Sequence, residues 1–310
     1  MNVLVTGAAG FTGRRMMAYL ATQKDVTPVG LVRREIPKTG DLPTIPMVAD
    51  LLDNQRLQAV IPSACPDAVI HLAGLTGGSP EVLHATNVEG TKNLLDAVIR
   101  FNPACRILVV SSSAVYGYAG DGPIPETSPL KPVSDYGKSK AEQEMIAFDY
   151  AFKEKSAVAV ARPFNLAGPG QTDVFVCGRI VNQVVDIERG ERDALDLWET
   201  SSSRDLIDVR DVVSGYWALL SHPDFPAECS GKAFNLGAGK AFRVSEIIAI
   251  VAAITGNHYR VRLPDTPHPI RIPTQQSDNA RITALTGWLP EIPLEKTLRD
   301  MLDAARNTKN

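Results

Sequence analysis

Short, almost wholly apolar runs alternate with longer stretches of helical spacing through the first half of the chain, and this pattern constrains the fold most. The runs lie at residues 3–6, 27–32, 45–49, 68–72, 107–111 and 157–162. Strands that are apolar along their whole length are typical of parallel sheets covered on both faces. Helical stretches at residues 14–22, 82–101 and 136–152 lie between several of these runs. The alternation predicts an α/β fold with a doubly wound parallel sheet and right-handed crossovers.

After about residue 165 this rhythm changes. A helix is predicted near 175–189 and two short helices at 280–285 and 294–305, while a strand at 206–209 and a helix at 212–220 are predicted to return to the first domain. We therefore divide the chain into a sheet domain, residues 1–165 plus 204–237, and a smaller discontinuous α/β lobe, residues 166–203 plus 238–310. Such a lobe would cover the carboxyl ends of the strands, where open α/β sheets bind ligands. Trp198 is expected in its core, with a place lining the sugar pocket as the alternative.

Composition excludes several classes of protein. Lysine and arginine total 32 and aspartate and glutamate 35, a net charge of −3, which argues against a nucleic-acid or membrane-surface binder. The longest apolar run, Ile247 to Ile254, is far shorter than a bilayer span. The start of the chain predicts a strand rather than a targeting segment. The four cysteines are widely spaced, so we expect buried thiols in a reducing compartment, a cytoplasmic location and no metal site.

A glycine-rich loop, Gly7-Ala8-Ala9-Gly10-Phe11-Thr12-Gly13, directly follows the first predicted strand and opens the first predicted helix. Gly7 suits a tight turn, Gly10 lets the backbone approach a pyrophosphate, and Gly13 lets the helix pack closely on the strand. The helix N-terminus then offers unpaired N–H groups and a positive dipole end to phosphates. The spacing is GxxGxxG rather than GxGxxG. The prediction of a dinucleotide site therefore rests on the position of the loop, directly after a strand and before a helix. A loop without a ligand is the alternative.

The end of the second predicted strand bears on the choice between NADP(H) and NAD(H). It reads Arg33-Arg34, with no carboxylate before Glu35. A carboxylate would repel a ribose 2′-phosphate, whereas arginine pairs with it through charge-assisted hydrogen bonds. NADP(H) is therefore preferred, and NAD(H) remains possible if the arginines only stack on adenine or face solvent. Asp50, followed by Leu51, is a candidate contact for the adenine amino group, and an exposed acid in a loop is the alternative.

Hydroxyl and ammonium groups gather at the reactive end of the predicted sheet. Ser111 to Ser113 end one strand, and Tyr136 and Lys140 share one face of the helix that follows. An ammonium about 4 Å from the phenol, at an effective dielectric of ~20, contributes about 4 kcal/mol. That attraction would lower the pKa of the phenol from about 10 toward neutrality. The tyrosine could then exchange a proton with a carbonyl or alcohol, while a serine holds the same oxygen. A surface pair is the alternative for Tyr-x-x-x-Lys alone.

Taken together, these motifs resemble the extended short-chain dehydrogenase/reductases of the nucleotide-sugar epimerase/dehydratase family. The match runs from end to end in the family's order. The matching segments are VTGAAGFTG (5–13), DL (50–51), HLAG (71–74), NVEGT (87–91), SSSAVYG (111–117), YGKSK (136–140), ARPFNLAGPGQ (161–171), SRDLIDVRDVV (203–213), FNLGAG (234–239) and TGWLP (286–290). The resemblance implies a Rossmann-type sheet with a substrate-binding lobe and an NAD(P)-dependent oxidoreductase.

The resemblance also implies roles for individual residues. Ser112, four residues before Tyr116, matches the catalytic serine, Tyr136 the acid/base, and Lys140 the residue that holds the nicotinamide ribose. The expected cofactor contacts are Gly7, Gly10, Phe11, Thr12, Gly13, Arg33, Arg34, Asp50, Leu51, Leu72, Ala73, Gly74, Tyr136, Lys140 and Pro163. The expected substrate contacts are Ser112, Ser113, Asn165, Arg179, Arg204 and Arg271. The family's dimers pair two helices from each subunit, here residues 91–101 and 136–152, so a homodimer is expected.

One departure from the family's pattern bears on the reaction. Ser113 and Ala114 follow Ser112, where the family's 4,6-dehydratases place a glutamate and its epimerase-reductases place a cysteine. Alanine cannot abstract a proton beside a ketone, which disfavours dehydration and C3/C5 epimerisation. Hydride chemistry at C4 of the sugar remains.

The leading hypothesis is NADPH-dependent reduction of the 4-ketone of a nucleoside-diphosphate 4-keto-6-deoxy-hexose, as in the branch that reduces GDP-4-keto-6-deoxy-D-mannose. The alternatives are a nucleotide-sugar 4-epimerase with retained NAD(P), reduction of a small carbonyl compound, and, in a different class, a non-catalytic cofactor-sensing relative.

Overall fold

The computed structural model describes residues 1–35, 42–44, 46–266 and 270–308. Seven parallel strands form the central sheet, in the order β11-β7-β5-β4-β1-β2-β3. Their bounds are β1 Asn2–Thr6, β2 Thr27–Val32, β3 Met47–Val48, β4 Ala68–His71, β5 Arg106–Val110, β7 Val158–Pro163 and β11 Ala233–Leu236. The strand order reverses between β1 and β4, which is where ligands bind in sheets of this kind.

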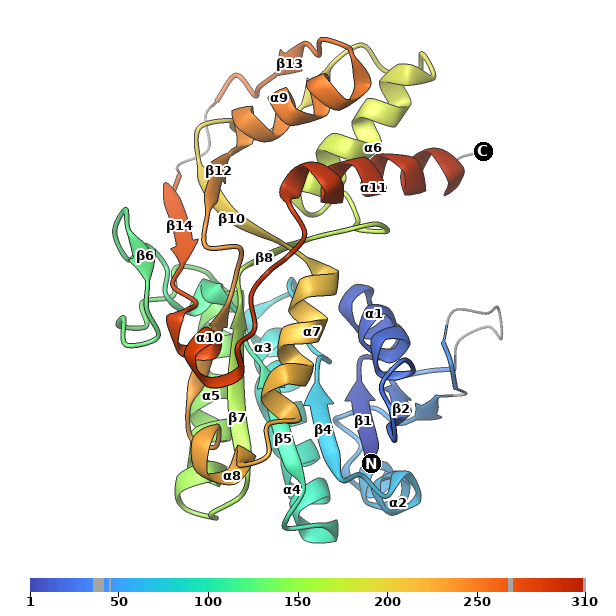
Figure 1. The fold of residues 1–310 in the computed structure, drawn as a ribbon, viewed down its shortest axis with the longest axis vertical. Coiled ribbons are helices and arrows are strands. Elements are labelled where there is room, and N and C mark those ends of the chain that lie inside the picture. Colours follow the sequence, from blue (N-terminus) through green and yellow to red (C-terminus); the bar gives the residue numbers. More distant parts are fainter. Residues whose placement is uncertain (36–41, 45, 267–269, 309–310) are drawn as a thin grey trace.

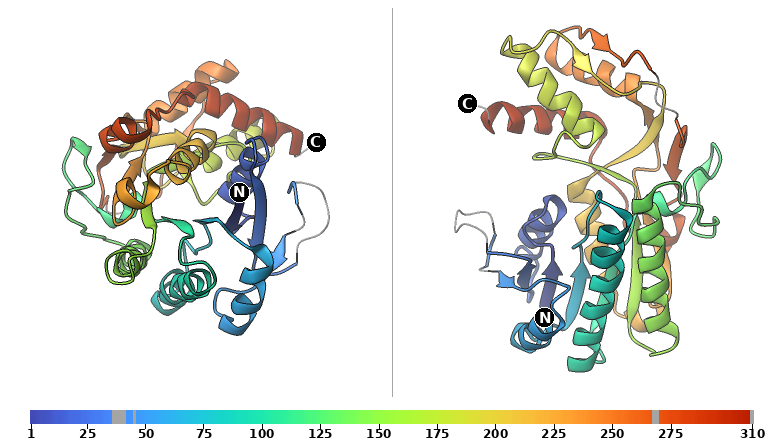
Figure 2. Two further views of the ribbon diagram at one scale, coloured as in Figure 1. Left: turned by 60° about the horizontal axis from the view of Figure 1, so that its bottom comes forward. Right: turned by 180° about the vertical axis from the view of Figure 1, so that it is seen from behind.

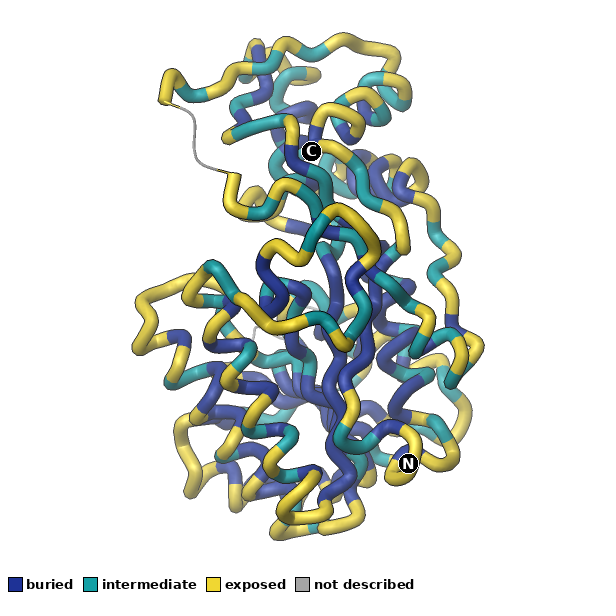
Figure 3. Tube along the Cα trace, turned by 90° about the vertical axis from the view of Figure 1, so that its left-hand side faces the viewer, coloured by how far each residue is buried: buried dark blue, intermediate teal, exposed yellow. Residues whose placement is uncertain are grey.

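Helices cover both faces of this sheet (Figures 1 and 2). On one face pack α2 (Asn54–Ala64), α4 (Gly90–Phe101) and α5 (Asp135–Phe152). On the other pack α1 (Phe11–Leu20), α7 (Val209–Leu220) and α10 (Ala280–Thr286). The strands between them are the buried centre of the molecule (Figure 3). Apolar runs buried on both sides explain why the strand pattern lacks an alternation of polar and apolar residues.

A smaller lobe lies beyond the carboxyl ends of the sheet strands (Figure 1). Its sheet has the order β12-β10-β14-β6, with β8 also paired to β10, and a separate pair joins β13 to β9. The strands are β6 Pro123–Ile124, β8 Asn165–Ala167, β9 Leu195–Asp196, β10 Ser203–Asp208, β12 Ala241–Arg243, β13 Val261–Arg262 and β14 Thr274–Ser277. Helices α6 (Val176–Glu188), α9 (Val244–Thr255) and α11 (Leu294–Thr308) form the core of this lobe with β9 and β10.

Four short helices complete the description. They are α3 (Pro80–His84), the π-helix η1 (Ala85–Glu89), the 3₁₀ turn η2 (Ser113–Val115) and α8 (Phe225–Glu228). Of these, η1 leads directly into α4 and η2 directly follows Ser112 at the end of β5.

The predicted doubly wound sheet is confirmed, and most predicted strands and helices form within a few residues of their expected ends. Ile45, the expected start of the third strand, lies outside the described residues. The strand expected over 206–209 forms as β10, but it does not return to the large sheet as expected. Its partners are β8, β12 and β14, because its polar first half is hydrogen-bonded within the smaller lobe. What returns is α7, followed by β11.

Two expectations about single residues were wrong. Cys65 is exposed, whereas the other three cysteines are buried as expected, because Cys65 ends α2 at the surface in a left-handed conformation. Trp198 is 57% exposed rather than part of the lobe's core, because it follows β9 at the surface. In the part of the chain that the structure describes, no helix combines the length and the apolarity that a membrane span needs.

Candidate active site

The glycine-rich loop connects β1 to α1 at the carboxyl edge of the large sheet. A Cβ on Gly13 would lie 2.1 Å from the carbonyl oxygen of Gly7, so only glycine allows α1 to begin this close to the loop. Gly10 is the N-cap of α1 and is exposed, and no side chain caps the helix there. The first N–H groups of α1 therefore remain for an anion, and Phe11 and Thr12 are half-buried beside them. This geometry fits a dinucleotide pyrophosphate.

The other expected cofactor residues surround the same edge. Arg33 and Arg34 are exposed at the end of β2, and Leu72, Ala73 and Gly74 follow β4. The half-buried Asp50 accepts a hydrogen bond from the amide of Leu52 at 3.0 Å. Leu51 is buried against α4, where its carbonyl accepts from Asn93 at 3.0 Å, and Pro163 is buried at the end of β7. Leu51 and Pro163 therefore shape the edge through packing.

Tyr136, Lys140 and Ser112 come together where β5 ends and α5 begins. Ser134 caps α5 by accepting from the amide of Gly137 at 3.1 Å, which places Tyr136 in the first turn. A Cβ on Gly137 would lie 2.7 Å from the carbonyl of Ala114, so glycine lets α5 pack tightly on the turn that follows Ser112. The Ser112 side chain lies close enough to the Tyr136 phenol to lower its pKa through hydrogen bonding. The expected catalytic set is thus brought together in space.

The expected effect of Lys140 on Tyr136 is not what the structure shows. Burial raises the pKa of Tyr136 above 10, and the opposing effect comes from the hydrogen bond with Ser112. The Lys140 ammonium instead donates to the carbonyl of Val110 at 2.6 Å. Its own pKa is lowered to about 7 by burial, which the Glu144 carboxylate partly opposes. Helical spacing correctly predicted a shared face, but the lysine side chain is directed to β5.

A buried ion pair lies one turn beyond Lys140. Glu144, 1% exposed, accepts from Arg162 on β7 through Nε at 2.9 Å and Nη2 at 2.7 Å. Arg162 also donates to the Tyr116 hydroxyl at 2.8 Å, and that hydroxyl donates to Asn235 on β11 at 2.7 Å. The bidentate pair fixes α5 on β7, because leaving either charge unpaired in the core would be strongly destabilising.

His71 is fully buried beneath the site, and its hydrogen bonds define its tautomer. The Thr91 hydroxyl donates to the carbonyl of Asn87 at 2.6 Å, so it must accept from His71 Nε2 at 2.8 Å. His71 Nδ1 then accepts from the Thr6 hydroxyl at 2.7 Å, which itself accepts from the Ala73 amide at 3.0 Å. Burial, followed by the charge of Lys140, lowers the pKa of His71 to about 3, so the ring is neutral.

Asn87, in the π-helix η1, extends this hydrogen-bond network to α5. It accepts from the Leu75 amide at 2.8 Å and donates to the Leu75 carbonyl at 3.0 Å. It also donates to the Ser139 hydroxyl at 2.9 Å, and Gln143 donates to Thr91 at 2.7 Å. The strand ends of β1 and β4 are thereby connected through η1 to the helix that bears Tyr136 and Lys140.

The expected substrate residues fall into separate places. Asn165 on β8 donates to the Asp205 carbonyl at 3.3 Å, next to Arg204 on β10, so these two lie together. Burial lowers the pKa of the half-buried Arg204 guanidinium, which Glu199 opposes. Arg271 is exposed and donates to the Val133 carbonyl at 3.0 Å, just before α5 begins.

Arg179 lies farther along the lobe, over the ring of Trp198 at 5.2 Å from the guanidinium carbon to the ring centroid. The two line a surface pocket with residues of β9 and β13 and their flanks. The lining residues are Arg179, Asp196, Leu197, Trp198, Arg262, Leu263 and Pro264. An aromatic face, apolar neighbours and charges of both signs are suited to a planar polar group.

Ser113 has a different partner from the one expected. It is 4% exposed, and its hydroxyl donates to Gln275 on β14 at 3.0 Å. The side chain is therefore held inside the protein rather than directed to a substrate, because the turn η2 directs it toward the smaller lobe. Gln275, Glu144 and Arg162 were missed by sequence reasoning. The spacing of Glu144, four residues after Lys140, was the one available signal.

Dinucleotide-binding geometry, neighbouring serine and tyrosine side chains, and a lysine at the end of the same strand fit an NAD(P)-dependent enzyme of the oxidoreductase type. Residues 3–237 match the family described as the NAD dependent epimerase/dehydratase family. The chain belongs to that family, and it modifies nucleotide sugars as an extended short-chain dehydrogenase/reductase.

Individual relatives are similar over nearly their whole length. GDP-6-deoxy-D-mannose reductase of Pseudomonas aeruginosa is 34% identical over 97% of this chain and 96% of that protein. GDP-6-deoxy-D-talose 4-dehydrogenase of Aggregatibacter actinomycetemcomitans is 28% identical over 94% of this chain and 97% of that protein. The structure of RMD from Pseudomonas aeruginosa complexed with NADPH superposes with a TM-score of 0.87, at 30% identity, over 99% of this chain and all of that one.

The buried Lys140 generates a testable prediction about stability. Its pKa is about 7 in the folded protein and about 10.5 when exposed, so the folded state binds fewer protons and is destabilised fully below pH 7. The burial penalty is about 5 kcal/mol, less about 1 kcal/mol for the hydrogen bond to Val110. We expect Lys140→Met to raise the free energy of unfolding by about 4 kcal/mol at pH 6, measured by urea denaturation.

This gain should shrink toward zero as the pH approaches 10.5, because the exposed lysine then loses its proton as well. The control is Lys138→Met, two residues earlier on α5, where the lysine is exposed and pairs with Asp135. A gain that does not depend on pH would contradict the assignment of the effect to the buried charge.

Proposed function

We propose that the enzyme reduces the C4 ketone of a nucleoside-diphosphate 4-keto-6-deoxy-hexose with NADPH, and that the nucleotide is GDP. The observation that carries this proposal is Ala114. It follows the turn residue Ser113 beside the catalytic hydroxyls, where an acid or thiol would be needed for proton abstraction next to the ketone. The similarity to GDP-6-deoxy-D-mannose reductase supports the choice of sugar and base.

The partners of several acids and thiols among the described residues support the exclusion of proton abstraction beside the ketone. Glu144 is occupied by Arg162, and Glu126 accepts from the Asn235 amide at 2.9 Å. The buried cysteines belong to three separate cores, of which Cys177 packs between α6 and its neighbours in the smaller lobe. None of these groups is therefore placed to act as a base for proton abstraction beside the ketone, which favours addition of a hydride to C4.

Each residue of the catalytic set has a distinct part in the proposed reaction. The bound reduced nicotinamide supplies a hydride to C4 of the sugar. Tyr136 donates its phenolic proton to the ketone oxygen, which becomes the hydroxyl of the product. Ser112 holds the same oxygen through a hydrogen bond. Lys140 holds the ribose hydroxyls and offsets the charge of the phenolate that Tyr136 becomes.

The remaining site residues are proposed as contacts of the two ligands. The glycine loop with Phe11 and Thr12, the strand-end residues Leu72 to Gly74, and Asp50, Leu51 and Pro163 would line the dinucleotide. Asn165 and Arg204 would hold the diphosphate, together with Arg271. Residues 1–165 plus 204–237 would bind the cofactor and residues 166–203 plus 238–310 the sugar nucleotide, with β10 between them.

The pocket at Trp198 is the proposed place of the nucleobase. It lies on the same lobe as Arg204, and its aromatic ring is exposed beside Arg179. A base between the ring and the apolar side chains of Leu197 and Leu263 would gain stacking energy. The carboxylate of Asp196 is paired with Arg192 and Arg262, and its remaining lone pairs would accept from the N–H groups of guanine.

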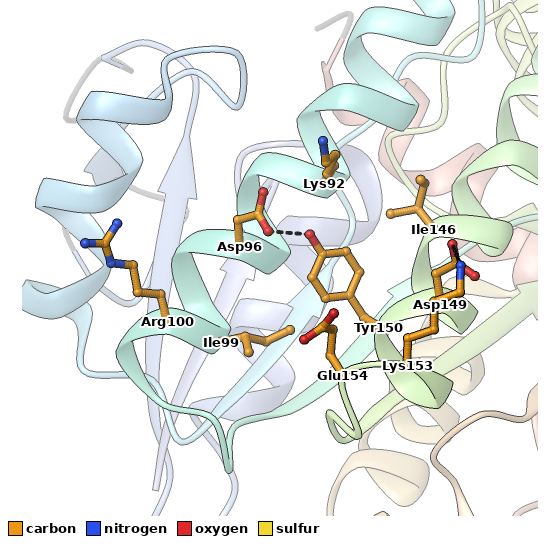
Figure 4. A pocket seen from close by; sticks show the side chains of 9 residues that line it. All are labelled: Lys92, Asp96, Ile99, Arg100, Ile146, Asp149, Tyr150, Lys153 and Glu154. Carbon is orange, nitrogen blue, oxygen red and sulfur yellow. Dashed lines mark hydrogen bonds and ion pairs between the residues drawn. The ribbon is translucent and has the colours of Figure 1, made fainter.

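We also propose that two copies associate through α4 and α5. These helices lie side by side on one face of the sheet, and a pocket between them is lined by side chains of both (Figures 2 and 4). Tyr150 of α5 donates to Asp96 of α4 across that pocket (Figure 4). Met145 and Phe152 are 68% and 60% exposed on α5, an apolar surface that a second copy would cover.

The central test of the proposed function is an assay of NADPH oxidation with GDP-4-keto-6-deoxy-mannose and its UDP and dTDP counterparts. The GDP sugar should be reduced fastest. Tyr136→Phe should lower kcat at least about a hundredfold, since general acid catalysis is typically worth 10²–10⁴-fold, and should leave NADPH binding unchanged. Interconversion of ordinary nucleotide hexoses without added cofactor would instead identify a 4-epimerase.

The arginines after β2 generate a prediction about the coenzyme. Arg33→Ala combined with Arg34→Ala should raise the KM for NADPH about tenfold or more, because each lost charge-assisted hydrogen bond is worth about 1.5–3 kcal/mol. The KM for NADH should stay within about twofold, because NADH lacks the 2′-phosphate. Arg299→Ala, on the exposed face of α11, is the control. An equal loss for both coenzymes would refute the 2′-phosphate contact.

The exposed tryptophan gives a direct measurement of nucleotide binding. The chain has three tryptophans; Trp288 is 7% exposed and Trp217 is half-buried, so a quench on ligand binding would report mainly on Trp198. GDP should quench the fluorescence, Trp198→Phe should remove most of the quench, and Trp217→Phe should keep it. Trp198→Ala should weaken GDP binding about tenfold, in line with the stacking energy of one base. Unchanged affinity would place the base elsewhere.

A further inference from the structure

The side-chain amide of Gln275 makes hydrogen bonds to the turn that follows Ser112. Gln275 lies on β14 of the smaller lobe and is 4% exposed. Its Oε1 accepts from the Ser113 hydroxyl at 3.0 Å, and its Nε2 donates to the Ser113 carbonyl at 2.9 Å and the Gly117 carbonyl at 3.4 Å. Both ends of the amide are thus used on one short segment, and both partners are buried.

The segment that Gln275 holds by these hydrogen bonds determines where the Ser112 hydroxyl points. Ser113 is the first residue of η2, and the amides of Ala114 and Val115 donate to the side chain and the carbonyl of Ser112, at 3.1 and 3.2 Å. The backbone of residues 112–115 is therefore one hydrogen-bonded unit. Because α5 packs against this unit through Gly137, a rotation of the turn would separate Ser112 from Tyr136.

The strand that carries Gln275 is also joined to the strand that carries Arg204. β14 runs parallel to β10, with Gln275 in register with Arg204. Asp205, fully buried, accepts from the amide and the hydroxyl of Ser277 at 2.9 and 2.6 Å. Arg204, the proposed diphosphate contact, and Gln275, which holds the turn after Ser112, therefore lie on one hydrogen-bonded pair of strands.

We propose that Gln275 is a positioning residue for the reaction, which orients Ser112 through Ser113 and couples that orientation to the strand that holds the sugar diphosphate. This inference rests on the proposed function, in which Ser112 holds the ketone oxygen. Gln275 does not touch the reacting atoms. Its effect is on the geometry of the hydroxyl, and a displacement of about 1 Å in such a group can lower turnover about a hundredfold.

The kinetic test uses GDP-4-keto-6-deoxy-mannose and NADPH with Gln275→Leu, which keeps the size of the side chain and removes its hydrogen bonds. We expect kcat to fall between about ten- and a hundredfold, while the KM for the sugar nucleotide stays within about twofold. Ser113→Ala, which removes one of the three hydrogen bonds, should give a smaller loss of the same kind. Ser113→Ala also provides the kinetic test if Gln275→Leu folds poorly.

A matched control is the next residue on the same strand. Gln276 points to the opposite face of β14 and donates to the Gly239 carbonyl at 2.8 Å, so Gln276→Leu should leave kcat unchanged. A double-mutant cycle then separates positioning from general damage. If Gln275 acts through Ser112, Gln275→Leu should cause no further loss of kcat in a Ser112→Ala background.

A measurement without substrate tests directly whether Gln275 holds the turn after Ser112. Hydrogen exchange of the peptide covering residues 112–118 should be faster in Gln275→Leu than in the wild type, and unchanged in Gln276→Leu. Equal exchange in all three, equal kcat for the two glutamine variants, or a full additional loss in the Ser112→Ala background would each overturn the inference. If the wild type fails to oxidise NADPH with any of the sugars, the proposed function fails, and exchange alone decides whether Gln275 holds the turn.

Discussion

Hydrogen bonding among buried polar side chains at the carboxyl edge of the large sheet determines where α5 lies. An unpaired polar group in the interior is destabilising by several kcal/mol, so each member of the network restricts the position of the next. His71 connects β4 to Thr6 of β1 and to Thr91 of α4, and Asn87 connects η1 to Ser139 of α5. Tyr136 and Lys140 take their places from this arrangement, together with the ion pair between Glu144 and Arg162.

One buried carboxylate joins the smaller lobe to the loop that follows the last strand of the large sheet. Asp205 is fully buried and accepts from the Ala238 amide at 2.6 Å and the Gly239 amide at 3.0 Å, in the loop that follows β11 of the large sheet. It also accepts from Ser277 of β14. Burial raises its pKa, and these four donors oppose that rise only in part, so the hydrogen bonds offset part of the cost of removing the charge from water. Both lobes thus meet at the strands that carry Arg204 and Gln275.

The sequence predicted the large sheet because parallel strands buried on both faces leave continuous apolar runs. It missed α2, which contains Pro62, and α9, which it treated only as an apolar run. The spacing of Tyr136 and Lys140 predicted a shared helical face, but spacing does not determine where a flexible lysine ends, and the ammonium lies at Val110. Gln275 belongs to no motif, because a residue that acts through hydrogen bonds to a distant turn leaves no local pattern.

The directions of the two pKa shifts suit reduction better than oxidation. A reductase needs Tyr136 to carry its proton when the ketone binds, and burial, which raises the pKa of the phenol, keeps the proton there at neutral pH. Once the proton is transferred, the phenolate is a buried anion, and its attraction raises the pKa of the nearby Lys140 from about 7, so the ammonium is retained. In the proposed reaction the lysine would thus stabilise the charge that appears on the phenol, rather than prepare the phenol beforehand. An enzyme that began with the alcohol would need the phenolate first, against the burial that opposes it.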